Sequence, residues 1–157
     1  MSQAELDQLL ADRSLVREGF DDEQVIAFWA KAAASFADSG VPDLSSDGAF
    51  QRVYTAALQA SFATLAAHGL RVKSTANHYK TFYAIRKLDD ALAPHGVAFD
   101  EMRATRNDSV YEAVHDEEEL AERVAEARAF LPDALTALRA AILAVRPALA
   151  PRLPHIR

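Results

Sequence analysis

The chain has 157 residues and a net charge of −6, with half of its residues apolar and a quarter charged, which fits one domain with a substantial core. It contains no cysteine, so disulfide frameworks, thiolate catalysis and cysteine-ligated zinc are excluded. No run approaches the roughly twenty apolar residues that span a bilayer. The acidic start MSQAELDQLL also lacks the features of a secretory signal. We therefore expect a cytoplasmic protein with no membrane association.

Apolar residues recur at three- and four-residue steps along most of the chain, a period typical of α-helices, and the glycines fall between these runs. A capping-box pattern at residues 2–5 opens a short first helix. Asp21 is a good N-cap for a second helix that carries Trp29 on its apolar stripe. This helix should reach about Ser39 and end at Gly40.

The middle of the chain predicts two further helices. A third helix follows a cap at Ser45 or Ser46 and ends at Gly69, because glycine tolerates the left-handed conformation that terminates helices. A fourth helix follows a cap at Ser74 or Thr75. Short connections between these helices indicate that chain neighbours run in opposite directions.

The last third of the chain predicts two more helices and a tail. The fourth helix should stop before residues 94–96, and a fifth helix should span roughly residues 99–111. Acidic residues from Asp116 onward open a sixth helix, which Pro132 should kink or restart. The proline-rich tail, residues 147–157, is expected to be frayed.

The predicted fold class is all-α, an antiparallel bundle of about five to six helices that forms one domain over residues 1–146. Trp29 and Phe62 are expected in its core. The apolar stripes are longer than a single four-helix core needs, which favours a two-fold homodimer. No H-E-x-x-H motif occurs, and we expect neither a metal site nor a cofactor.

Charge is unevenly distributed along the chain. Between Arg71 and Arg106 there are seven basic residues and four acidic ones, a local charge of +3 in an acidic protein. Such a surface could meet nucleic acid or the phosphates of a nucleotide. The alternative is a set of ordinary solvated helix faces.

One segment, M-R-A-T-R-N-D-S-V-Y-E, gathers side chains that could bind a ligand. On a helix, Arg103, Asn107 and Tyr111 share one stripe at four-residue steps, and Arg106 lies on its flank. The guanidinium groups offer forked donors for phosphate, and the tyrosine offers a stacking face for a base.

Two structural alternatives stay open for these residues. Arg106 could instead pair with Asp108 or Glu112 and only stabilise the bundle. His78, near the start of the fourth helix, could contact a ligand in the same cleft or could bond to a backbone carbonyl.

The segment GLRVKSTANHYKTFYAI, followed by M-R-x-x-R-N-x-x-x-Y, resembles the HEPN superfamily (higher eukaryotes and prokaryotes nucleotide-binding domains) over roughly residues 27–138. The resemblance implies a small, commonly dimeric helical bundle. In the nuclease branch, an arginine and a histidine a few residues later face their copies across the dimer and cut RNA without metal. Arg106 and Asn107 match this motif, but Tyr111 stands where the histidine is expected. A phenol with a pKa near 10 is a poor general base at neutral pH.

The resemblance therefore implies a non-catalytic or weakly catalytic module that binds nucleotide, RNA or a partner protein. Its setting would be a toxin–antitoxin or stress-defence system, with a cognate antitoxin or a nucleotidyltransferase as partner. One alternative is an active metal-independent endoribonuclease toxin, in which Arg106 and Tyr111 would be catalytic. The other is a plain dimeric scaffold.

Overall fold

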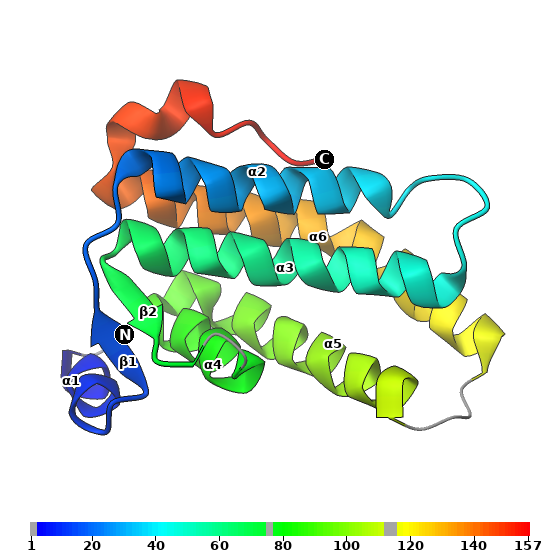
Figure 1. Ribbon diagram of the computed structural model, residues 1–157, viewed down its shortest axis with the longest axis horizontal. Helices are drawn as coiled ribbons and strands as arrows, with labels where there is room; N and C mark the ends of the chain where they lie inside the picture. The colour runs from blue at the N-terminus through cyan, green and yellow to red at the C-terminus, as the bar shows by residue number, and fades with distance from the viewer. Residues whose placement is uncertain (1–2, 75–76, 112–115) are drawn as a thin grey trace.

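The structure is a computed structural model that describes residues 3–74, 77–111 and 116–157, with the side chains of residues 109–111 left undescribed (Figure 1). The predicted caps Ser2 and Thr75 lie outside these residues. The predicted all-α bundle is confirmed, with a small two-stranded sheet added to it. In chain order, the elements are α1 (Gln3–Ala11), β1 (Leu15–Arg17), α2 (Asp22–Asp38), α3 (Ser46–Ala67), β2 (Leu70–Val72), α4 (His78–Leu88), η1 (Asp90–Leu92), α5 (Ala93–Tyr111), α6 (Glu117–Val145) and η2 (Pro147–Arg152).

The central element is α3, which packs against α2 and α6 on one side and against α4 and α5 on the other (Figure 1). The chain neighbours α2 and α3 run in opposite directions, as expected (Figure 1). In contrast, α3 and α6 run in the same direction. Ser46 N–H donates to Glu117 Oε1 at 3.2 Å where both helices begin, and His68 Nε2 donates to the Ala141 carbonyl at 3.0 Å near their ends.

The buried residues of α3 combine small side chains with large ones such as Phe50 and Leu65. Seven alanines of α3 are buried, and their small side chains allow close helix packing. Trp29 is 1% exposed, which confirms its predicted place in the core. Phe62 is only half-buried, so its predicted core position is wrong. It lies on the flank of α3 that faces a surface pocket.

The C-terminal tail is packed onto the bundle, so the predicted frayed tail is wrong. Trp29 Nε1 donates to the Pro154 carbonyl at 2.8 Å, and Arg139 Nε donates to the Leu153 carbonyl at 2.6 Å. Both carbonyls lie outside helices and strands, so these side-chain donors supply their hydrogen bonds. The buried apolar side chains of the tail are Leu149, Leu153 and Ile156.

Two three-residue strands, which the sequence analysis did not predict, pair in antiparallel fashion. Leu15 lies opposite Val72, and both side chains are buried. Gly69, with φ of 70°, turns the chain from α3 into β2, a backbone conformation that suits glycine. The sheet thereby fixes the end of α3 and the three residues that follow Gly69.

Several helix boundaries differ from the prediction. The cap of α4 is Asn77 rather than Ser74, and its side chain accepts a hydrogen bond from the Lys80 N–H. Helix α5 begins at Ala93, well before the expected start, because proline is tolerated in a first helical turn. Pro132 lies inside α6, which continues from Glu117 to Val145 without a restart.

Candidate functional site

An open polar cleft of about 470 Å³ lies where the start of α4 faces the middle of α5. It contains four of the five predicted site residues: His78 from α4 and Arg103, Arg106 and Asn107 from α5. The fifth is Tyr111, whose side chain lies outside the described part of the chain. Residues some thirty positions apart in the sequence therefore meet in one cleft.

The spacing of α4 and α5, which sets the width of this cleft, depends on a close helix contact. A Cβ atom on Gly96 of α5 would lie 2.8 Å from the backbone nitrogen of Arg86 on α4. Only glycine allows this approach. Phe82 and Phe99, both fully buried, pack at a centroid distance of 5.6 Å and hold the two helices together.

Arg106 is held by neutral groups of α3. Its Nε donates to Gln51 Oε1 at 3.2 Å, and its guanidinium lies 5.2 Å from the centroid of the Tyr54 ring. Among the described residues, no carboxylate forms a salt bridge with Arg106. Asp108, one of the two expected partners, is exposed, and Glu112 lies outside the described residues. Within the described ranges, the half-buried charge of Arg106 therefore has no carboxylate to offset it.

Arg103 has a different environment. Its Nε donates to Asp100 Oδ1 at 2.6 Å, and its guanidinium lies 5.5 Å from the centroid of the Tyr79 ring. The carboxylate of Asp100 offsets part of its charge. Arg106 is therefore the less compensated of the two cations in the cleft.

His78 is oriented by a tyrosine of α3. Tyr54 Oη lies 2.6 Å from His78 Nδ1, and burial raises the pKa of the Tyr54 phenol to about 12. Burial, and then the charges of Arg106 and Arg103, lower the pKa of His78. At neutral pH both groups are therefore uncharged and share one hydrogen bond; where the phenol donates to Nδ1, the imidazole proton lies on Nε2.

Gln51 and Tyr54 are the site residues that sequence reasoning missed. Both lie on α3, about fifty residues before Arg106, and Tyr54 is only 2% exposed. The available signal was the phenol itself, because a buried tyrosine hydroxyl usually requires a hydrogen-bond partner.

The arrangement is suited to binding anionic oxygen atoms. Donor groups along one cleft are two guanidinium groups, the amide of Asn107 and, in the tautomer protonated on Nε2, the imidazole of His78. Within the described ranges, no group of three or more histidine, aspartate or glutamate residues could hold a metal ion. Glu112 and His115, which have Glu-x-x-His spacing, lie outside those ranges. None of the described helices is long and apolar enough to cross a membrane.

Comparison with known proteins identified no similar protein. A scan against models of protein families found no match, and searches of curated proteins and of solved structures found none either. The likeness to the HEPN superfamily rests on the quoted residues, and function must be argued from the cleft itself.

Proposed function

We propose that the protein binds the phosphate groups of a nucleotide or of RNA in the cleft between α4 and α5. The observation that carries this proposal is the environment of Arg106. Its guanidinium is held by the amide of Gln51 and the ring of Tyr54, so its charge is positioned but not neutralised by the described residues. A planar guanidinium with free donors matches phosphate geometry.

Neighbouring groups favour a nucleotide over inorganic phosphate. Tyr79 is 46% exposed at the cleft, with Arg103 at 5.5 Å and Tyr83 at 6.2 Å from its ring centroid, so a base can contact the part of the ring that these two residues leave uncovered. The amide of Asn107 offers both a donor and an acceptor for a base edge. The cleft volume, about 470 Å³, lies within the range of small-molecule sites.

The resemblance to the HEPN superfamily supports the same ligand class, and with it a cytoplasmic homodimer that works with an antitoxin or a nucleotidyltransferase. Val97, exposed on α5 and outside the residues that line the cleft, offers an apolar contact for a second copy. We expect light scattering at micromolar concentration to report twice the chain mass of 17.2 kDa. A monomer under these conditions would contradict the dimer.

Ligand binding is tested by fluorescence anisotropy with labelled single-stranded RNA and with a labelled mononucleotide. Arg106→Ala should weaken binding about tenfold or more, since hydrogen bonds to a charged group contribute about 1.5–3 kcal/mol. It should also reduce the slope of log affinity for RNA against log salt concentration by about one, as expected for the loss of one phosphate contact. Arg106→Lys keeps the charge and loses the forked donors, so its affinity should lie between those of the wild type and Arg106→Ala.

The matched control is Arg123→Ala, which removes an exposed arginine of α6 whose described partner is Glu126. This variant should bind nearly as well as the wild type. If Arg106→Ala leaves binding unchanged, the cleft is structural and the scaffold interpretation is correct. Equal losses in both variants would show unspecific attraction to the surface charge.

One observation favours a second candidate function, metal-independent RNA cleavage. An uncharged histidine, His78, shares the cleft with Arg106. In the tautomer whose Nδ1–H donates to Tyr54 Oη, its Nε2 can accept a proton near neutral pH. Labelled RNA should be incubated in chelator with the wild type, Arg106→Ala, His78→Gln and Tyr111→His. A binding module leaves RNA intact. Cleavage by the wild type that is lost in Arg106→Ala and His78→Gln would establish the nuclease.

A further inference from the structure

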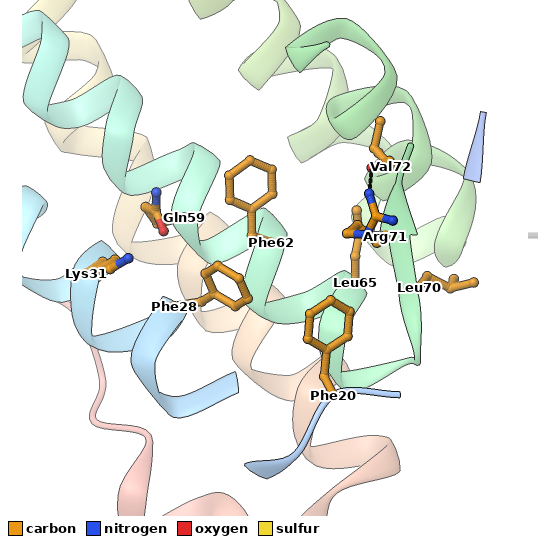
Figure 2. A pocket seen from close by; sticks show the side chains of 9 residues that line it. All are labelled: Phe20, Phe28, Lys31, Gln59, Phe62, Leu65, Leu70, Arg71 and Val72. Atoms are coloured by element: carbon orange, nitrogen blue, oxygen red, sulfur yellow. Dashed lines mark hydrogen bonds between the residues drawn. The ribbon is translucent and has the colours of Figure 1, made fainter. Parts of the chain in front are cut away.

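A second pocket, of about 260 Å³, opens on another flank of α3, between α2, α3 and β2 (Figure 2). Three half-buried phenylalanines form most of its apolar wall: Phe20 before α2, Phe28 on α2 and Phe62 on α3. The ring centroids of Phe28 and Phe62 lie 5.9 Å apart, and those of Phe20 and Phe28 lie 6.3 Å apart. These rings form a row that leaves part of each phenyl surface in contact with solvent.

One polar atom in this wall lacks a partner. Gln59 Oε1 is enclosed by the protein, yet it accepts no hydrogen bond from the described residues. Leaving a buried acceptor unpaired costs free energy, and an apolar residue of similar shape would avoid that cost. Figure 2 shows Gln59 beside Phe62, with its oxygen on the side of Phe28 and Lys31. The Gln59 side chain is half-buried and lines the pocket, so a rotation of its amide would present this acceptor to a donor from outside the chain.

A cation lies at the same end of the row of rings. Lys31, an exposed residue of α2, lines the pocket near Gln59 (Figure 2). No carboxylate in the described ranges forms an ion pair with Lys31. Arg71, the other cation of the pocket, is already paired with Glu18 at 2.9 Å. Lys31 is thus the group that can attract an anion to this end.

We propose that this pocket binds a free aromatic α-amino acid. The side-chain ring would pack among Phe20, Phe28 and Phe62, the ammonium would donate to Gln59 Oε1, and the carboxylate would pair with Lys31. An α-amino acid fits because its ammonium and its carboxylate are attached to the same carbon. Their protein partners, Gln59 and Lys31, likewise lie at the same end of the pocket. A cavity of about 150 Å³ holds a benzene molecule, so the present volume accommodates one ring and this head group.

Each part of the proposal corresponds to one probe, measured by titration calorimetry and by amide chemical shifts. L-phenylalanine should bind best. Phenylpropionate lacks the ammonium, phenethylamine lacks the carboxylate and L-alanine lacks the ring. We expect a loss of roughly tenfold without the ammonium, a few-fold loss without the carboxylate at the exposed lysine, and no measurable binding without the ring.

Two variants assign these losses to their residues. Gln59→Leu should abolish the advantage of L-phenylalanine over phenylpropionate, and Lys31→Gln should abolish its advantage over phenethylamine. Lys73→Gln, a change at another exposed lysine, is the control and should leave all affinities unchanged. Gln59→Leu should also raise the melting temperature of the free protein, since it removes an unpaired buried acceptor.

The proposal is overturned if L-phenylalanine binds no better than L-alanine, or if Gln59→Leu leaves the preference for the ammonium intact. It is also overturned if the wild type is a dimer that Phe62→Ala converts to a folded monomer while L-phenylalanine fails to bind. The row of rings would then be covered by a second copy of the chain. None of these outcomes depends on RNA binding at the α4–α5 cleft.

Discussion

The two sides of α3 differ in what their residues contribute. Toward α2 and α6, the helix packs on elements that bury large apolar side chains such as Trp29 and Leu138. Toward α4 and α5, it presents Gln51 and Tyr54, whose polar atoms contact Arg106 and His78. The first side holds the chain together, and the second orients side chains around an open cleft. Substitutions on the two sides should therefore separate stability from ligand binding.

A finer comparison concerns two half-buried glutamines of the same helix. Gln51 Oε1 accepts a hydrogen bond from Arg106, whereas Gln59 Oε1 has no partner in the described part of the chain. The α4–α5 cleft is therefore assembled by contacts within the protein, and the aromatic pocket is completed only by an added donor.

The largest expected effect is on the core side. Trp29→Ala should lower the free energy of unfolding by about 3–5 kcal/mol, the usual cost of removing a buried aromatic side chain. It also leaves the Pro154 carbonyl without its indole donor. Arg106→Ala should change stability far less. Urea unfolding of both variants measures this separation, and a comparable loss in the two would contradict it.

The next effect tests the contact that links the two sides of the cleft. Gly96→Ala should destabilise the protein by about 1–3 kcal/mol, because the new methyl group meets the Arg86 backbone and neither helix can yield easily. Ligand affinity should fall with it as α4 and α5 separate. Gly19→Ala is the control, since a Cβ atom there has no neighbour within 4 Å, and its melting temperature should match that of the wild type.

A smaller effect should follow from Tyr54→Phe. The ring and its contact with Arg106 are kept, but Nδ1 of His78 loses its hydrogen-bond partner. We expect nucleotide affinity to fall a few-fold, because the imidazole loses the hydroxyl that holds its orientation and its tautomer. Imidazole nitrogen shifts report this change directly. A His78 tautomer identical to that of the wild type would show that Tyr54 does not position it.

The smallest effect is a dependence of stability on pH. Burial lowers the pKa values of His68, His78 and His95 below their ordinary value of 6.5. The unfolded chain then binds more protons than the folded one, so stability is complete above pH 6.5 and is lost as the pH falls below it. Melting temperatures should drop between pH 7.5 and about pH 5. His68→Gln, whose amide can still donate to the Ala141 carbonyl, should reduce that drop.

The sequence predicted the features that depend on local order along the chain. Helical period and caps predicted the helices, and four-residue spacing placed Arg103 and Asn107 on one face of a helix. Features that depend on tertiary packing were missed. Strands of three residues are too short for an alternation signal, and Gln51 reaches Arg106 only because α3 packs on α5. The frayed tail was wrong because proline content does not reveal an arginine, Arg139, that binds the tail carbonyls.

The aromatic pocket was also missed because it depends on tertiary packing. Helical period places Phe62 on an apolar face, but it does not tell a face covered by another helix from one left open to solvent. Phe62 lies on an open face, beside the pocket between α2 and β2.

The most direct test of the α4–α5 cleft is a nuclear magnetic resonance titration of protein with 15N-labelled histidine, using adenosine monophosphate as the ligand. We expect free His78 to carry its proton on Nε2, and its imidazole signals to shift as the nucleotide binds. His68, bonded to the Ala141 carbonyl away from the cleft, should stay unmoved as the internal reference. Saturating nucleotide that leaves His78 unchanged, or that moves both histidines alike, would contradict binding at this cleft.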